Sequence, residues 1–257
     1  MNKDFKKIKI KKLLENDEEQ IKLKREINPI LPRIDKHQVM LVLGGIGVGK
    51  SSLVANLIFS NEIYGYNGNT LYDYVFVISP TLNNDKNQFM YRDRSVENDG
   101  NFILFDNYSD EIIDEIMEFQ RKKEGEIQPF SLLVMEDVIG TGTNNNHSKI
   151  SELITKTRHF QLSIILIGQN INQAFSSTIK ANTRQIFLKK MRNTKELKKF
   201  IEQYADMFGG EDNFKKMYDY TFKGENTKYN FIYCNLDDLF CMKNFEELMY
   251  YNEELLI

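Results

Sequence analysis

The sequence predicts an α/β fold in which a mostly parallel sheet is covered by helices on both faces. Short, continuous apolar runs alternate with segments of helical periodicity, which is typical of strands buried on both faces. A glycine-rich segment directly follows the first apolar run and precedes a helical pattern. With 257 residues, 41% of them hydrophobic, the chain can bury one large core. We therefore expect one principal α/β domain.

The expected elements follow one another along the chain. Apolar runs predict strands at residues 40–43, 74–79, 102–105, 132–135, 164–167 and 186–188. Helical periodicity predicts helices at 51–59, 110–122, 150–157 and 176–180. From residue 194 onward the pattern changes to two polar helices, 194–207 and 211–222, and then to two edge strands, 229–235 and 240–243.

The glycine-rich segment fits the pattern G-x-x-x-x-G-K-[ST], which binds the phosphates of a nucleoside triphosphate. Glycines let the backbone wrap around a polyphosphate, and the following helix adds its positive N-terminal end. Lys50 is placed to reach the β- and γ-phosphates, and the Ser51 hydroxyl to bind the bridging Mg²⁺. We expect ATP and Mg²⁺ as ligands. The expected nucleotide-binding residues are Gly44, Gly45, Ile46, Gly47, Val48, Gly49, Lys50, Ser51 and Ser52.

Two carboxylates, Glu136 and Asp137, follow the apolar run at 132–135. An NTPase needs one carboxylate to hold Mg²⁺ and, for fast hydrolysis, another to polarise the attacking water. Neighbouring side chains on a strand point to opposite sides, so this pair can serve both purposes. The usual order in this class is Asp before Glu, whereas here Glu comes first. Position therefore assigns Glu136 to the metal and Asp137 to the water, while residue type assigns Asp137 to the metal.

Gln169 follows the next apolar run, at the sheet edge where open α/β folds bind ligands. Its amide can hydrogen-bond both the attacking water and a γ-phosphate oxygen, and so distinguish ATP from ADP. Two arginines can supply charge to the transition state: Arg158, within Thr157-Arg158-His159, and Arg184, before the last core strand. We expect Arg158 to act on the site of a neighbouring subunit, because it lies after a helix and before the strand of Gln169.

Composition indicates how the protein can contact nucleic acid, the redox state of its cysteines and whether it spans a membrane. The formal net charge of −3 means that contact with nucleic acid must come from local patches. Cys234 and Cys241 are the only cysteines, and we expect both to be reduced core residues. No apolar run reaches the roughly 20 residues that cross a bilayer, so we expect no membrane span.

Charge and proline placement predict three parts of the chain. Residues 1–36 alternate lysine-rich and acidic stretches, which indicates a charged N-terminal arm. We assign residues 37–190 to the P-loop ATPase core and residues 191–257 to a small α+β extension packed on it. The junction is basic, and we expect either a solvated helix face or a surface that faces DNA or another subunit. Its basic residues are Lys189, Lys190, Arg192, Lys195, Lys198 and Lys199.

Taken in order, these motifs resemble one family. The chain resembles the DNA-packaging ATPases of large double-stranded DNA viruses and virophages, the poxvirus-type branch of the FtsK/HerA superfamily. The similarity covers residues 38–190 well and the C-terminal part loosely. The features that carry it are Gly44 to Ser51, Glu136-Asp137, Thr157-Arg158-His159, the strand that ends at Gln169, and residues 179–184.

The resemblance implies a RecA-like P-loop core, a homo-oligomeric ring of pentameric or hexameric form, and ATP-driven translocation of double-stranded DNA into a preformed capsid. It also implies a capsid or vertex protein as partner. The expected location is the host cytoplasm, at the viral factory, with transient presence at the virion vertex. The loop 140–149 would then be a candidate for the channel-facing segment. A ring multiplies a few inward lysines by symmetry, which explains how an acidic protein can act on DNA.

Two other functions stay open at this point. One is a HerA-like translocase or helicase in replication or repair, although the chain is too short for an obvious additional domain. The other is a nucleotide-gated assembly switch in which turnover is incidental. The paired acids and Gln169 argue against a switch, because a switch needs no fast water-activating site.

Overall fold

The computed structural model describes residues 30–31, 37–67, 69–82, 91–93, 100–121, 127–136, 148–171 and 175–257. Most of the expected N-terminal arm, the acid Asp137 and most of the expected channel loop 140–149 therefore lie outside the described residues.

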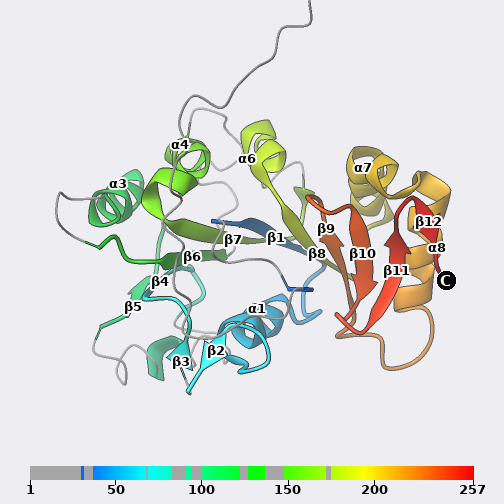
Figure 1. Ribbon diagram of the computed structural model, residues 1–257, viewed down its shortest axis with the longest axis horizontal. Coiled ribbons are helices and arrows are strands. Elements are labelled where there is room, and N and C mark those ends of the chain that lie inside the picture. The colour runs from blue at the N-terminus through cyan, green and yellow to red at the C-terminus, as the bar shows by residue number, and fades with distance from the viewer. Residues whose placement is uncertain are drawn as a thin grey trace, which may run out of the picture.

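A ten-stranded sheet crosses the molecule (Figure 1). Its parallel part has the order β5-β4-β6-β7-β1-β8, and β9 to β12 continue it on the β8 side with antiparallel pairing. The parallel strands are β5 (Phe102–Phe105), β4 (Tyr74–Ile78), β6 (Ser131–Glu136), β7 (Leu162–Gly168), β1 (Val39–Leu43) and β8 (Gln185–Lys189). All of these lie within two residues of the bounds that the sequence predicts.

The C-terminal strands differ from the prediction. We predicted β9 (Phe231–Asn235) and β10 (Phe240–Lys243) as edge strands, but both lie inside the sheet. Two further strands follow them, β11 (Glu247–Tyr251) and β12 (Glu254–Leu255). β12 has only two residues, whereas β11 contains the apolar run from Leu248 to Tyr251, which we did not predict as a strand. The sheet therefore ends at β5 on one side and at β12 on the other.

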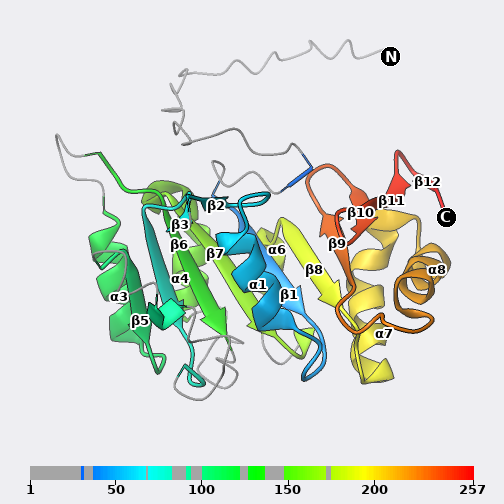
Figure 2. The same cartoon turned by 90° about the horizontal axis from the view of Figure 1, so that it is seen from below.

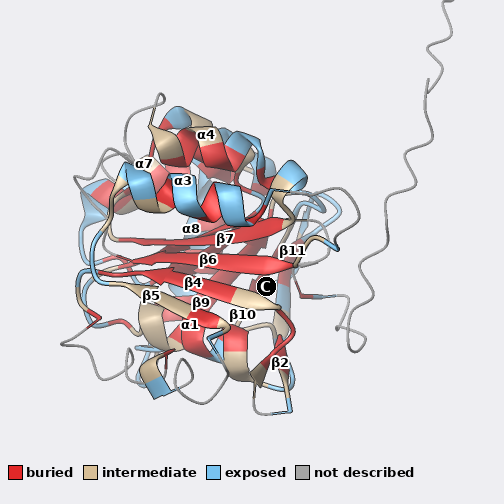
Figure 3. Cartoon of the chain, turned by 90° about the vertical axis from the view of Figure 1, so that its left-hand side faces the viewer, coloured by how far each residue is buried: buried red, intermediate tan, exposed pale blue. Residues whose placement is uncertain are grey.

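Helices cover both faces of the sheet (Figures 1 and 3). One face carries α1 (Lys50–Phe59) and the small hairpin of β2 (Gly65–Tyr66) and β3 (Asn69–Thr70), which the sequence did not predict. The helices on the other face are α3 (Asp110–Phe119), α4 (Lys149–Thr155), α6 (Ser177–Asn182), α7 (Thr194–Tyr204) and α8 (Glu211–Phe222). The predicted helix 194–207 is divided, because α7 gives way to the 3₁₀ helix η3 (Ala205–Phe208).

Alternate residues of each strand belong to two separate cores. Leu41 and Leu166 pack into the core beneath α3, α4, α6, α7 and α8, while Met40 and Ile165 pack beneath α1. All four side chains are fully buried, and Figure 3 shows the central strands β6 and β7 in the colour of buried residues. Burial on both faces is the physical reason why these strands read as continuous apolar runs.

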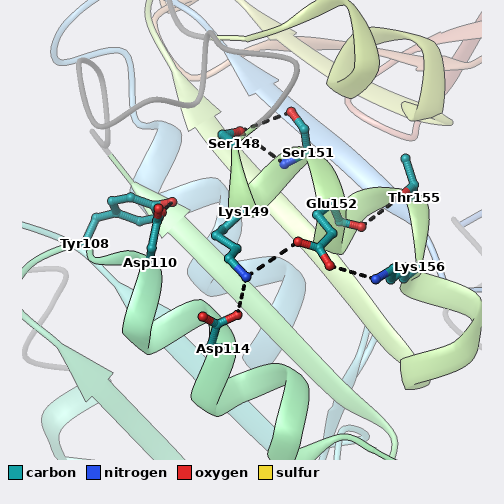
Figure 4. A network of polar contacts seen from close by, with 9 residues as sticks. All are labelled: Tyr108, Asp110, Asp114, Ser148, Lys149, Ser151, Glu152, Thr155 and Lys156. Carbon is teal, nitrogen blue, oxygen red and sulfur yellow. Dashed lines mark hydrogen bonds and ion pairs between the residues drawn. The ribbon is translucent and has the colours of Figure 1, made fainter.

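Exposed charges connect α3 to α4 (Figure 4). Lys149 Nζ lies 2.8 Å from Asp114 of α3 and 3.6 Å from Glu152 of its own helix. The side chain of Ser148 caps α4 by accepting a hydrogen bond from the N–H of Ser151, at 3.2 Å. Such exposed ion pairs each contribute only about 0.2–1 kcal/mol. They therefore orient α4 more than they stabilise the domain.

Within the described ranges, no helix combines the length and the apolar character of a bilayer-crossing segment.

Candidate nucleotide-binding site

The parallel strands bring the predicted site residues to one edge of the sheet. Their carboxyl ends point to the same side, which is the lower edge in Figure 2. The P-loop leaves β1, Glu136 ends β6, and Gln169 follows β7. Leu43 is level with Gly168, and Glu136 is level with Ile167. Residues that are more than 80 positions apart in sequence therefore meet around the P-loop.

Two glycines of the P-loop have positive φ angles, 70° at Gly47 and 81° at Gly49. An L side chain rarely adopts this conformation, so glycine is required for the loop to turn back over the helix N-terminus. Hydrogen bonds hold the loop between its neighbours, because the N–H of Gly44 donates to Gly168 at 3.3 Å and that of Gly45 to Lys190 at 3.1 Å. The loop is thus fixed to both strands that flank β1.

The side chains of the motif converge on the mouth of this loop. Lys50 Nζ donates to the carbonyl oxygens of Gly44 and Gly45, at 3.1 and 2.9 Å. The hydroxyl of Ser51 donates to Oε1 of Glu136, a carboxylate that is only 5% exposed. An ammonium, a hydroxyl and a buried carboxylate at a helix N-terminus fit a phosphate chain with its Mg²⁺.

The hydroxyl of Ser51 and the carboxylate of Glu136 also fit a metal ion that is bound mainly by the phosphates of a nucleotide. The described residues contain no group of three or more His, Cys, Asp or Glu side chains that could hold a metal ion. Mg²⁺ in nucleotide sites is typically bound by one or two protein oxygens together with phosphates and water. Ser51 and Glu136 are the two groups here that would hold it.

Tyr91 is a buried tyrosine that was not a predicted site residue, and its ring centre lies 5.9 Å from that of Phe59 at the end of α1. Its side chain is 1% exposed. Burial raises the pKa of the Tyr91 hydroxyl far above its usual value, and the negative charge of Glu136 raises it further. Tyr91 therefore stays protonated. The sequence carries no signal for this residue, because it stands in a polar segment without periodicity.

One residue of the basic junction, Lys189, is buried. The exposed residues Lys190, Arg192, Lys195 and Lys198 fit either a solvated helix face or a surface that faces DNA or another subunit. Lys189 is only 2% exposed, and its Nζ donates to the backbone oxygen of Tyr229 at 2.8 Å. A Cβ atom added at Gly44 would lie 2.8 Å from Cβ of Lys189. Burial, with a smaller effect of the nearby Lys50 charge, lowers the pKa of Lys189 to about 8. This lysine is therefore part of the wall behind the P-loop.

Two more residues from the β8–β9 side flank the P-loop. The stem of Arg192 packs on Gly45, and its Nη2 atom lies 3.9 Å from the Cβ position of Gly47. The ring of Tyr229 lies against Gly49, with Cδ1 2.9 Å from the Cβ position there. The sequence predicts Tyr229 as a strand residue, but β9 begins at Phe231.

The two candidate arginines lie away from the P-loop of their own chain. Arg158 is exposed in the 3₁₀ helix η2 (Thr157–Phe160), which precedes β7 and so lies at the opposite edge of the sheet. Arg184 precedes β8 at the same edge and forms an ion pair with Asp237, at 3.0 Å. Neither arginine can reach the P-loop of its own chain from there.

A separate cavity of about 330 Å³ lies at the carboxyl end of β4 and β5. No P-loop residue lines it, so the nucleotide site follows from the positions of the side chains rather than from this cavity. The lining residues are Leu82, Arg92, Leu104, Phe105, Asp106 and Asn107.

Comparisons with known proteins agree with this geometry. A family model described as Poxvirus A32 protein matches residues 33–246. No match to a curated protein reaches significance.

Solved structures with the same fold include viral packaging enzymes. The chain is similar to the genome packaging NTPase B204 from Sulfolobus turreted icosahedral virus 2 in complex with ATP-gammaS, at 12% identity and a TM-score of 0.54, over 81% of this chain and 97% of that one. It is also similar to B204, the DNA-packaging ATPase from Sulfolobus Turreted Icosahedral Virus, at 14% identity and a TM-score of 0.54, over 80% and 96%. At these identities the similarity shows a shared fold.

Burial of Lys189 predicts a dependence of stability on pH. The pKa of a free lysine is about 10.4, whereas that of Lys189 in the folded protein is about 8. Between these values the unfolded chain binds more protons, so raising the pH favours the folded state.

We expect the wild type to gain unfolding free energy relative to Lys189→Met as the pH rises from 7 to 10, as measured by urea unfolding at several pH values. Lys195→Met, at an exposed position, controls for the loss of one positive charge. A difference between wild type and Lys189→Met that is independent of pH would contradict the assignment.

Proposed function

The chain belongs to the Poxvirus A32 protein family, and on this premise we propose that it is an ATP-hydrolysing motor that translocates double-stranded viral DNA into a preformed capsid. One contact carries the ATPase part of the proposal: Ser51 of the P-loop is hydrogen-bonded to the buried carboxylate Glu136 at the end of β6. Motif and acid come from distant parts of the sequence, and the fold joins them where Mg²⁺ and the terminal phosphates would bind.

The nucleotide is ATP in this proposal, and Mg²⁺ is its metal. Two solved B204 structures contain ATP-gammaS and AMPPCP. The contact of Ser51 with Glu136 supports Glu136 as the metal-side acid, which leaves Asp137 to polarise the attacking water. Gln169 is half-buried next to Gly168, whose carbonyl binds the P-loop, and this position supports its role as a γ-phosphate sensor.

Hydrolysis is proposed to take place within a homo-oligomeric ring. Arg158 is exposed at the sheet edge opposite the P-loop, as a residue that serves a neighbouring subunit must be. Arg184, by contrast, is already paired with Asp237. We therefore favour Arg158 as the residue that acts in trans. A capsid or vertex protein is the proposed partner of the ring, at the viral factory in the host cytoplasm and transiently at the virion vertex.

Coupling to DNA predicts a salt-sensitive stimulation of ATP hydrolysis. We expect long double-stranded DNA to raise the turnover of the wild type severalfold and the effect to weaken as salt increases, because sequence-independent contacts to phosphates release counterions. Lys50→Ala should abolish turnover with and without DNA. The measurement is steady-state ATP hydrolysis at two salt concentrations, with Lys216→Ala on the exposed side of α8 as the matched control.

Two outcomes would favour the other functions. Turnover that is slow and indifferent to DNA favours a nucleotide-gated assembly switch. Strand separation on a forked substrate favours a HerA-like translocase or helicase.

The paired acids should respond differently to conversion into amides. Glu136→Gln is expected to weaken Mg²⁺-dependent ATP binding, because Glu136 faces Ser51. Asp137→Asn is expected to bind ATP normally but not to hydrolyse it. Calorimetric titration of ATP with and without Mg²⁺, followed by a hydrolysis assay, separates the two roles. The opposite pattern would assign the metal to Asp137.

Action in trans by Arg158 can be tested by mixing variants. Arg158→Ala is expected to bind ATP but to lose about a thousandfold or more in DNA-stimulated turnover. Adding Lys50→Ala subunits, which retain Arg158 but are inactive themselves, should restore part of the activity. Arg184→Ala is the matched arginine control at the same sheet edge. Full DNA-stimulated activity of Arg158→Ala would rule out this role.

A further inference from the structure

Tyr229 is an exposed aromatic side chain that precedes the buried strand β9. It is 63% exposed, whereas Phe231 and Tyr233, which follow in β9, are 8% and 0% exposed. Its ring packs against Gly49, the residue that precedes the P-loop lysine. An exposed aromatic ring held beside a polyphosphate-binding loop is a feature that structural packing does not require.

The backbone around Tyr229 is held on several sides. Lys189 Nζ donates to the Tyr229 carbonyl at 2.8 Å and lies 5.6 Å from the centre of the Phe231 ring. The side chain of Asn230 donates to Thr221 at 2.9 Å. The N–H of Phe231 donates to the side chain of Asn244, also at 2.9 Å. The ring position is therefore established by the fold and does not depend on a ligand to form it.

The direction of the phosphate chain places a nucleoside on this side. Ser51 and Glu136 mark the metal end of the site, and Glu136 ends β6, on one side of β1. Tyr229 precedes β9, which lies on the other side of β1, beyond β8. A nucleotide with its β- and γ-phosphates at Lys50 and Ser51 directs its nucleoside away from the metal end, and hence toward β8 and β9.

We propose that Tyr229 is the stacking platform for the base of the bound nucleoside triphosphate, an inference that rests on the proposed ATPase function. Lys228 Nζ lies 5.3 Å from the ring centre, so a positive charge stands beside the aromatic platform. Stacking depends on the face of a base and not on its edge. The platform therefore discriminates weakly between bases, including adenine and guanine.

The test compares a nucleotide with a ligand that has phosphates but no base. Binding of ATP and of inorganic tripolyphosphate, each with Mg²⁺, is measured by calorimetry for wild type, Tyr229→Phe, Tyr229→Leu and Tyr229→Ala. Loss of one base–aromatic stack is expected to weaken ATP binding about tenfold in the Leu and Ala variants. Tyr229→Phe should restore wild-type affinity, and tripolyphosphate should bind all four proteins equally. Tyr251→Ala, an exposed tyrosine on β11, is the control for surface substitution.

Tyr229→Leu separates stacking from packing, because leucine still fills the space against Gly49 without providing an aromatic face. Equal losses for ATP and tripolyphosphate would mean that Tyr229 only shapes the P-loop, and would overturn the inference. Normal ATP binding by Tyr229→Leu would overturn it as well. If the wild type binds neither ligand, whereas its unfolding is cooperative, the proposed ATPase function fails instead.

Discussion

Burial of β1 between β7 and β8 is the constraint on which the site depends. All five residues of β1 are buried, and its alternate side chains belong to two different cores. A slip by one residue would exchange these two sets, so the register with β7 and β8 is strongly specified. This register ends β1 level with Gly168 and places Gly44 and Gly45 within hydrogen-bonding distance of both neighbours. The position of the P-loop thus follows from core packing.

The candidate site has two halves, one on each side of β1. Ser51 and Glu136 form the half that suits a metal and terminal phosphates. Lys189 and Tyr229 belong to the half on the β8–β9 side, where a buried ammonium holds the backbone next to the P-loop. The C-terminal strands continue the core sheet and supply part of the wall of the site. Residues of both the P-loop core and the C-terminal extension therefore line the candidate site.

The opposite edges of the sheet suit the proposed assembly. The P-loop lies at the carboxyl edge and the exposed Arg158 at the amino edge. A head-to-tail contact that joins these edges uses two different surfaces of each subunit, and such contacts generate rings when the rotation closes. A ring of this type would complete each active site with a residue from the neighbouring subunit.

The sequence by itself determined the six parallel strands, the P-loop, the acid at the end of β6 and the position of Gln169. These features are encoded in short consecutive segments, since a phosphate-binding loop and a doubly buried strand both impose their residue types locally. Only the tertiary structure decided that Lys189 is buried, that Tyr229 contacts Gly49 and that β9 and β10 lie inside the sheet. Lys189 and Tyr229 are 40 positions apart, and β12, with two residues, is too short to show periodicity. Contacts of this kind depend on the order of the strands in the sheet, and short sequence segments do not determine that order.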